Sequence, residues 1–352
     1  MDVCGALRIV PKEVPLIWGG DALVRRFGKP GDPNAAIGES WECWDENAVI
    51  DGEFTGKTIA QLRALLGHDL VGELDPAQIF PILTKLIDAR QSLSVQVHPD
   101  DAYAQRVEGK PFGKTECWYI LDAQPDAAIV LGWSRDTSRE EYLKRVHDGT
   151  LGELLRRVPV HPGDVFYLPA GTLHAIGPGI ILFETQQASD LTYRIFDWNR
   201  LGPDGKGRQL HVDKAADVLN YRASHAGALA SLPYTLDGLT RTALVADPRF
   251  IMERVTLDAQ ARTLDLEGMP LAVLALETPI ECTTAQKTIV LPAYASALLA
   301  AHSERVSFRT PSGSGMMLTA APPRDAQALA RRVAAAGVPA DAWQHYVAQF
   351  AG

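Results

Sequence analysis

Short apolar runs separated by turn residues constrain the fold of this chain more than any other feature. Runs such as Ser92–Val97, Cys117–Leu121 and Val165–Leu168 are bounded by Gly, Pro or Asp residues, and similar runs lie at 128–131 and 180–184. Runs of this length and spacing are typical of a β-sandwich or β-barrel, in which short strands pair across tight turns. The sequence therefore predicts a mainly β fold.

Helical patterns interrupt these runs. Ile59–Leu66 follows a capping Thr58, Gln78–Ala89 carries an apolar face, and Ser138–Val158 has apolar residues at three-to-four spacing. A further short helix is expected at His211–Tyr221. We expect these helices to flank a barrel as insertions.

The length of 352 residues predicts about two domains. Strand-like alternation resumes at Phe250 after a turn-rich stretch, and Pro339 splits two helical patterns in the Ala- and Arg-rich C-terminal segment. We expect a first domain over residues 1–225 with helical insertions, a second barrel over 226–322 and a helical extension over 323–352. We assign no function to the extension.

Charge narrows the range of partners. Lys and Arg total 34 against 43 Asp and Glu, a net charge of −9, so no global positive field would gather nucleic acid. An anionic substrate would need a local basic pocket. The chain shows no basic leader and no apolar run of about 18 residues, so we expect no membrane partner.

The four cysteines are far apart in the sequence and form no C-x-x-C pair: Cys4, Cys43, Cys117 and Cys282. This usage fits neither a zinc ribbon nor a disulfide framework, so a reducing compartment is expected. We therefore expect a cytoplasmic protein.

Two potential metal ligands lie two residues apart, Gln96 and His98. In a regular strand both side chains leave the same face, so both could point into a barrel. The alternative is that Gln96 faces outward and His98 is a strand-end histidine beside Pro99. The pair by itself leaves both possibilities open.

The segment HPGDVFYLPAGTLHAIG supplies another candidate, His174. Gly163 and Asp164 can make a tight turn, VFYL a strand, and Pro169–Gly171 a second turn that delivers His174 at the start of the next strand. A histidine so placed can face the barrel interior. The alternative is a hairpin with a hydrogen-bonded structural histidine.

Glu116 begins an apolar strand in GKTECWYIL. An unpaired buried carboxylate is costly, and a divalent ion would supply its partner. Two imidazoles, a carboxylate and an amide oxygen suit zinc with room for substrate oxygens, while ligand type alone leaves iron and manganese open. We expect one zinc ion per chain, held by Gln96, His98, Glu116 and His174.

Longer segments around these residues resemble the type I mannose-6-phosphate isomerases in their shorter bacterial form. They are FPILTKLIDARQSLSVQVHPDD, GKTECWYIL, PGDVFYLPAGTLHAIG and ETQQASDLTYRIFDWNR, together with WGG at 18–20 and GESWE at 38–42. The resemblance runs from about residue 7 to about residue 220 and is fainter beyond. It implies a mainly β fold of two cupin (jelly-roll-like) β-barrels with helical insertions, the second without metal ligands, and the same four zinc ligands.

The resemblance also implies a reaction, the interconversion of mannose 6-phosphate and fructose 6-phosphate through a cis-enediol. Zinc would polarise the sugar oxygens. Glu184 resembles the family glutamate proposed as base, and Arg194 matches an arginine that would steady the enediolate. The alternatives are that Glu184 pairs with a nearby Lys or Arg, and that Arg194 pairs with Asp190 or Asp197.

Other polar residues are expected around the same cavity. Lys85 and Lys114 match family lysines, and we expect Lys114 to be catalytic and Lys85 to bind substrate. Ser94 lies on the strand of the ligand pair and can face the same interior. Lys206 and Arg208 lie in a Gly-rich loop that could close over a phosphate, although loop charges are more often solvated.

The segment after GESWE, CWDENAVI, departs from the polar and small-residue stretch expected of the family, so contacts from that loop are not carried over. Two rival functions stay open, a metal-dependent cupin oxygenase and a non-catalytic sugar-phosphate-binding paralogue. The amide ligand Gln96 and the cations Lys85, Lys114 and Arg194 favour a redox-silent ion and an anionic sugar. The sequence does not indicate the oligomeric state.

Overall fold

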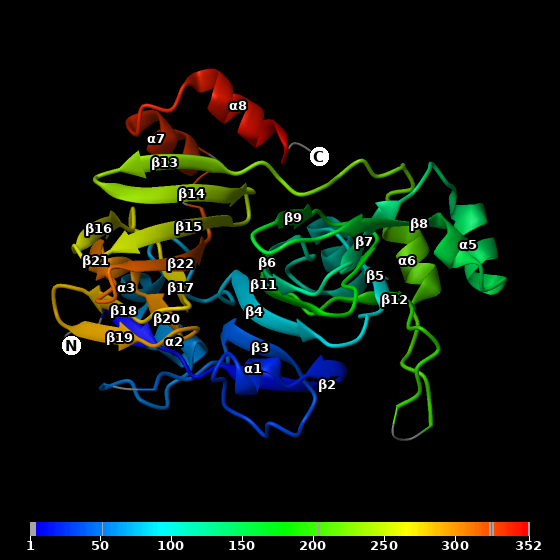
Figure 1. Ribbon diagram of the computed structural model, residues 1–352, viewed down its shortest axis with the longest axis horizontal. Coiled ribbons are helices and arrows are strands. Elements are labelled where there is room, and N and C mark those ends of the chain that lie inside the picture. Colours follow the sequence, from blue (N-terminus) through cyan, green and yellow to red (C-terminus); the bar gives the residue numbers. More distant parts are fainter. Residues whose placement is uncertain (1–4, 51, 203–204, 324, 326, 351–352) are drawn as a thin grey trace.

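The computed structural model describes residues 5–50, 52–202, 205–323, 325 and 327–350. In this part of the chain the strands form four antiparallel sheets, arranged as two neighbouring pairs (Figure 1). The six-stranded sheet contains, in spatial order, β2 (Lys12–Gly20), β3 (Ile37–Cys43), β4 (Ile82–Ala89), β11 (Ile180–Gln187), β6 (Glu116–Ala123) and β9 (Val165–Leu168). The five-stranded sheet contains β12 (Tyr193–Phe196), β5 (Val95–Val97), β10 (His174–Ala175), β7 (Ala128–Trp133) and β8 (Leu155–Pro159).

The second pair of sheets is built mostly from the C-terminal half. The seven-stranded sheet contains β1 (Ala6–Arg8), β20 (Ser296–Leu299), β17 (Leu271–Leu276), β22 (Ser314–Ala321), β15 (Ile251–Asp258), β14 (Leu239–Ala246) and β13 (Leu232–Leu236). The four-stranded sheet contains β16 (Arg262–Asp265), β21 (Arg305–Arg309), β18 (Ile280–Thr283) and β19 (Thr288–Leu291). The N-terminal strand β1 pairs with β20, so the second pair of sheets also includes the start of the chain.

Each pair of sheets encloses its own apolar core. Trp118, Phe166 and Leu182 belong to the core between the six- and five-stranded sheets, and Phe308 to that between the seven- and four-stranded sheets. A third cluster, which includes Phe183, joins the outer face of the six-stranded sheet to the seven-stranded sheet. The predicted mainly β fold is confirmed. The predicted domain boundaries stay predictions.

Short helices connect and cover the sheets. They are α1 (Ala22–Arg25), α2 (Ile59–Leu66), α3 (His68–Val71), α4 (Asp101–Tyr103), the π-helix η1 (Ala104–Glu108), α5 (Arg139–His147), the 3₁₀-helix η2 (Leu151–Leu154), α6 (Val212–Val218), the 3₁₀-helix η3 (Ala301–Ser303), α7 (Ala328–Ala335) and α8 (Ala340–Ala348). No helix in the described ranges is long and apolar enough to cross a membrane.

Several predicted helices are confirmed. The helix α2 has the predicted bounds, because Thr58 and Gln61 form a reciprocal capping box at its start. The helix α6 lies inside the predicted His211–Tyr221 segment, and Pro339 separates α7 from α8.

The helix predicted at Gln78–Ala89 is wrong, because Ile82–Ala89 is the strand β4. All eight residues of β4 are buried between β3 and β11. Because its polar residues are buried as well, its apolar residues, Ile82, Leu83, Leu86 and Ile87, are free to recur at the three-to-four spacing of a helix. The helix predicted over Ser138–Val158 stops at His147, and its last part forms η2 and β8. The hairpin β13–β14 lies partly in the stretch interpreted as turn-rich and without periodicity.

The cysteines Cys43, Cys117 and Cys282 are buried free thiols, whereas Cys4 lies outside the described residues.

Candidate metal centre

Two rows of side chains, one from each sheet of the first pair, project into the space between the two sheets. Across the five-stranded sheet, Gln96 on β5 lies opposite Arg194 on β12 and opposite His174 on β10. Directly opposed residues in antiparallel strands project from the same face, so these three side chains point the same way.

Across the six-stranded sheet, Lys85 on β4 lies opposite Trp41 on β3 and Glu184 on β11, and Glu184 in turn lies opposite Trp118 on β6. Glu116, two residues before Trp118, begins β6 and projects from the same face. The predicted metal ligands are therefore carried by both sheets.

The turn before β10 delivers His174 as the sequence predicts. Gly171 has a φ of +85°, which favours glycine, and its N–H donates a 2.9 Å hydrogen bond to the carbonyl of His98. A Cβ at this position would lie 2.9 Å from the carbonyl oxygen of Val218. The turn thus places the segment that leads into β10 next to His98, the residue that follows β5.

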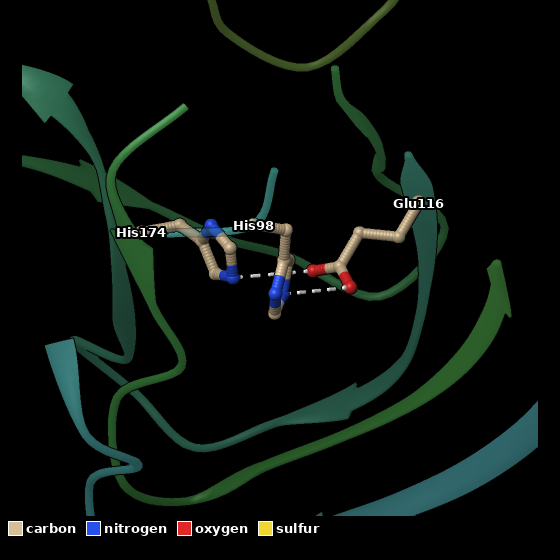
Figure 2. Close-up of side chains that lie close together, drawn as sticks. All are labelled: His98, Glu116 and His174. Atoms are coloured by element: carbon tan, nitrogen blue, oxygen red, sulfur yellow. Dashed lines mark ion pairs between the residues drawn. The ribbon is translucent and has the colours of Figure 1, made fainter. Parts of the chain in front are cut away.

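His98, Glu116 and His174 converge in the interior (Figure 2). Their potential ligand atoms all lie within 4.8 Å of one another, and the three residues are buried. The carboxylate faces both rings, with Oε2 3.4 Å from Nε2 of His98 and Oε1 3.3 Å from Nε2 of His174.

Backbone carbonyls orient both imidazole rings. Nδ1 of His98 lies 2.7 Å from the carbonyl oxygen of Leu191, and Nδ1 of His174 lies 2.9 Å from that of Thr172. Since a carbonyl only accepts, each Nδ1 carries a hydrogen, and in a neutral ring Nε2 then presents its lone pair to Glu116. Burial, with help from Lys114, lowers the pKa of His98 to about 3, and burial also lowers the pKa of His174.

This arrangement fits a cation. Two nitrogen lone pairs facing a buried carboxylate repel it; the Lys114 ammonium relieves this repulsion at Oε2, and a metal cation would relieve it at Oε1. Oε1 of Glu116 is buried and has no hydrogen-bond partner within the described ranges. Two imidazoles and a carboxylate are donors that zinc prefers.

The side chain of Gln96 also lies beside the cluster of His98, Glu116 and His174. Its Nε2 lies 3.3 Å from Nε2 of His174, and its Oε1 accepts a 3.2 Å hydrogen bond from the hydroxyl of Ser94. A carboxamide exchanges its oxygen and nitrogen by a half turn, so Gln96 can supply an oxygen donor. Its role as a ligand remains a prediction.

Lys114 lies between the cluster and the cavity. Its Nζ is 2.5 Å from Oε2 of Glu116, 3.3 Å from Nε2 of His98 and 4.0 Å from Oε1 of Glu184. Burial opposes the ionisation of Glu116, but Lys114, His98 and His174 together more than offset it and hold the pKa of Glu116 well below its usual value. Lys114 is therefore placed to touch both the metal centre and a substrate.

Glu184 lies almost fully buried beside the cluster. Its Oε2 accepts a 3.0 Å hydrogen bond from Nε1 of Trp118, and its Oε1 lies 3.3 Å from Nζ of Lys85. Burial raises the pKa of Glu184, although Lys114 and Lys85 oppose the rise. The ion pair with Lys85 was the alternative expected from the sequence, and a carboxylate in this position also suits proton transfer.

A cavity of about 150 Å³ opens beside these residues. Its lining includes most of the predicted substrate-binding and catalytic residues, namely Lys85, Ser94, Lys114, Glu184, Arg194 and Arg208, together with the predicted metal ligand Gln96. Lys206 is exposed on its loop and is not part of this lining. The predicted closing loop thus brings one of its two cations to the cavity.

Arg194 and Arg208 differ in their partners. Nη1 of Arg194 donates to the carbonyl of Gln209 at 2.9 Å, and its Nε is buried with no hydrogen-bond partner among the residues described. Arg208 instead makes a bidentate pair with Asp197, at 2.7 and 2.6 Å, and Asp197 also binds Arg200. Burial, together with the neighbouring Arg208, lowers the pKa of Arg194.

Sequence reasoning missed Glu39, which lines the cavity and lies 3.4 Å from Nζ of Lys85. It also missed Trp18, Trp118 and Thr192 as lining residues. Glu39 belongs to the GESWE segment, and its i, i+2 spacing to Trp41, which would put both side chains on one face of a strand, was a signal that could have singled it out.

The sequence and the fold match known proteins. The family described as phosphomannose isomerase type I, catalytic domain, matches residues 7–133. The mannose-6-phosphate isomerase ManA of Bacillus subtilis is 47% identical over 207 residues, which span 58% of this chain and 64% of that protein.

Solved structures extend the likeness over most of the chain. A crystal structure of the mannose 6-phosphate isomerase from Bacillus subtilis is 31% identical, covers 90% of this chain and 99% of its own, and superposes with a TM-score of 0.82. A zinc-bound mannose 6-phosphate isomerase, 14% identical, covers 90% of this chain and 99% of its own with a TM-score of 0.71, and shares the fold.

Two pairs of antiparallel sheets, with a His–Glu–His cluster inside one pair, define the chain as a cupin protein with a candidate metal centre. More particularly, the chain belongs to the type I mannose-6-phosphate isomerase family.

Proposed function

We propose that this chain is a zinc-dependent aldose–ketose isomerase that interconverts mannose 6-phosphate and fructose 6-phosphate. The observation that carries the proposal is the convergence of His98, Glu116 and His174, with ligand atoms within 4.8 Å, beside a cavity lined by Lys85, Glu184 and Arg194. Family membership favours the same conclusion. The aligned stretch of the Bacillus subtilis relative ManA spans 64% of that protein, so the activity is proposed for this chain and tested below.

Gln96, His98, Glu116 and His174 would hold the ion. A bound divalent cation polarises substrate oxygens and stabilises negative charge that develops on them. The imidazoles and the amide are neutral, so Glu116 alone would compensate one of the ion's two positive charges. The cavity next to the cluster is the space from which sugar oxygens would approach.

The charges around the cavity suit a phosphate ester. Three carboxylates, of Glu39, Glu116 and Glu184, face three cations, of Lys85, Lys114 and Arg194, while Arg208 is paired with Asp197. These six charges cancel, so with a divalent ion bound the net charge of the site is +2. This excess matches the dianion of a phosphate monoester.

Glu184 moves the proton in this proposal. It takes the proton from C2 of the aldose, and the C–H electron pair becomes the C1=C2 double bond of a cis-enediol as the carbonyl oxygen at C1 gains a proton. Return of the proton to C1, with loss of the hydroxyl proton at O2, gives the ketose. Burial raises the pKa of Glu184, which makes it a stronger base than an exposed carboxylate.

The cations orient the substrate. Arg194 offers a buried, unpartnered Nε to an anionic oxygen and cannot lose its proton, so it would stabilise the enediolate. Lys114, within reach of both Glu116 and Glu184, would hold a hydroxyl between the ion and the base. Lys85 and Ser94 would bind further hydroxyls or the phosphate.

The three buried free thiols, Cys43, Cys117 and Cys282, are compatible with the cytoplasmic location expected from the sequence.

The test is a coupled assay for fructose 6-phosphate production on purified protein, before and after removal of the metal with a chelator. We expect activity that the chelator abolishes and added zinc restores. Binding of mannose 6-phosphate without turnover would establish the non-catalytic paralogue instead. Stoichiometric iron with turnover-linked oxygen uptake would establish the oxygenase.

A further inference from the structure

Glu39 and Trp41 on β3 lie beside the proposed catalytic residues and have no assigned role. Oε2 of Glu39 accepts a 2.7 Å hydrogen bond from Nε1 of Trp41 and lies 3.4 Å from Nζ of Lys85. The Lys85 ammonium also lies 5.2 Å from the centre of the Trp41 ring. Three contacts therefore join Glu39, Trp41 and Lys85 to one another, and Glu39 and Lys85 line the cavity.

The other side of Lys85 faces Glu184. Nζ of Lys85 is 3.3 Å from Oε1 of Glu184 and thus nearly equidistant from the two carboxylates. The strand order β3–β4–β11–β6 (Figure 1) produces this arrangement. Trp41, Lys85, Glu184 and Trp118 are successive partners in one cross-strand row of these four strands. Each carboxylate in turn accepts a hydrogen bond from a tryptophan N–H, Glu39 from Trp41 and Glu184 from Trp118.

We propose that Glu39 is a positioning residue, which holds the Lys85 ammonium between two carboxylates so that Glu184 can gain and lose a proton while Lys85 stays compensated. The inference rests on the proposed function. Lys85 is 9% exposed at its side chain, and a buried ammonium without a counter-ion is strongly unfavourable. If Glu184 were the only partner of Lys85, each protonation of Glu184 would leave that charge uncompensated.

The direction of the effect follows from the groups that face Glu184. Lys85 on β4, Lys114 before β6 and Arg194 on β12 are cationic, while Glu39 on β3 and Glu116 on β6 are anionic. Removing the charge of Glu39 strengthens the pull of Lys85 on Glu184. The carboxylate form of Glu184 then persists to lower pH and is a weaker base.

The Glu39→Gln variant tests the inference, because it keeps the size of the side chain and removes its charge. We expect kcat to fall about tenfold or more while KM changes less than about threefold, since proton transfer weakens while Arg194, Lys114 and Ser94 still bind the substrate. The acid limb of the kcat–pH profile should move to lower pH. Glu39→Asp, which restores the charge, should recover part of the lost kcat. Glu46→Gln removes a surface carboxylate that is 64% exposed and should leave the profile unchanged.

Further measurements on Glu39→Gln separate a change in the position of Lys85 from a loss of zinc or of folding. Zinc content and thermal midpoint of Glu39→Gln should match those of the unaltered protein, and its crystal structure should show Nζ of Lys85 shifted from the residue at position 39 toward Glu184. An unchanged kcat and pH profile, or a Lys85 that keeps its place in the variant, would overturn the inference. Failure of the unaltered protein to turn over mannose 6-phosphate would refute the proposed function, and the crystal structure would still decide whether Glu39 positions Lys85.

Discussion

Replacing His174 by alanine is the sharpest test of the metal centre. The substitution reduces the proposed ligand set from four to three and leaves Glu116 facing one imidazole. Loss of residues that merely orient ligands weakens metal affinity by about 10- to 100-fold, so loss of a ligand should cost at least about 100-fold. At a zinc concentration 100 times the dissociation constant, binding stabilises the folded protein by about 2.7 kcal/mol, and after a 100-fold loss of affinity by only about 0.4 kcal/mol.

These free energies become shifts of the unfolding midpoint. For a chain of 352 residues, treated as one cooperative unit, an unfolding entropy of about 2.1 cal/mol/K per residue turns them into zinc-induced rises of about 4 °C and below about 1 °C. The comparison is between metal-stripped and zinc-loaded samples of each protein, so any packing defect left by the alanine cancels.

The assay is differential scanning calorimetry with elemental analysis of zinc. His147→Ala is the control, because His147 is 89% exposed at the end of α5 and should keep the full zinc-induced rise. The reasoning is refuted if His174→Ala binds one zinc per chain and shows the same rise as the unaltered protein.

The remaining predictions concern the proposed chemistry and the join between the two pairs of sheets. Arg194→Ala should keep zinc bound and lower turnover at least about tenfold, as elemental analysis and the coupled assay would show; normal turnover would contradict its role. Glu184→Gln should keep zinc and lose exchange of the C2 proton with solvent, followed by NMR in deuterium oxide, and retained exchange would clear Glu184 as the base. Lys29→Met should destabilise the protein by about 3–5 kcal/mol in denaturant titration, since Lys29 and Glu42 form a buried ion pair at 2.6 Å. Lys12→Met, in an exposed pair, should cost less than about 1 kcal/mol, and equal losses would refute the argument.

Local signals in the sequence were sufficient to locate elements whose backbone geometry depends on a few neighbouring residues. Thr58 and Gln61 satisfy the first backbone N–H groups of α2, and this capping pattern located the helix to the residue. The turn residues around Val165–Leu168 did the same for β9, and Gly171 for the start of β10. Gln78–Ala89 was misinterpreted because burial on both faces removes the alternation that distinguishes a strand from a helix.

The four ligand candidates were found from residue type, strand periodicity and family resemblance, and His98, Glu116 and His174 do converge. Glu39 was missed because its significance depends on a partner 46 positions later, Lys85, which is opposite Trp41 only once β3 and β4 have paired. The pairing of Arg194 with Asp197, one of the alternatives left open by the sequence, is not formed, since Arg200 and Arg208 occupy that carboxylate.

The sequence by itself determined the mainly β fold, the capped helices, the turns around β9 and β10, and the kinds of side chain available to bind a metal ion and a phosphate. These depend on a few neighbouring residues, on periodicity or on composition. Only the tertiary structure decided which side chains meet. The rows Arg194–Gln96–His174 and Trp41–Lys85–Glu184–Trp118 arise from the register of strands far apart in the chain, and a shift of one residue would turn every one of these side chains to the opposite face.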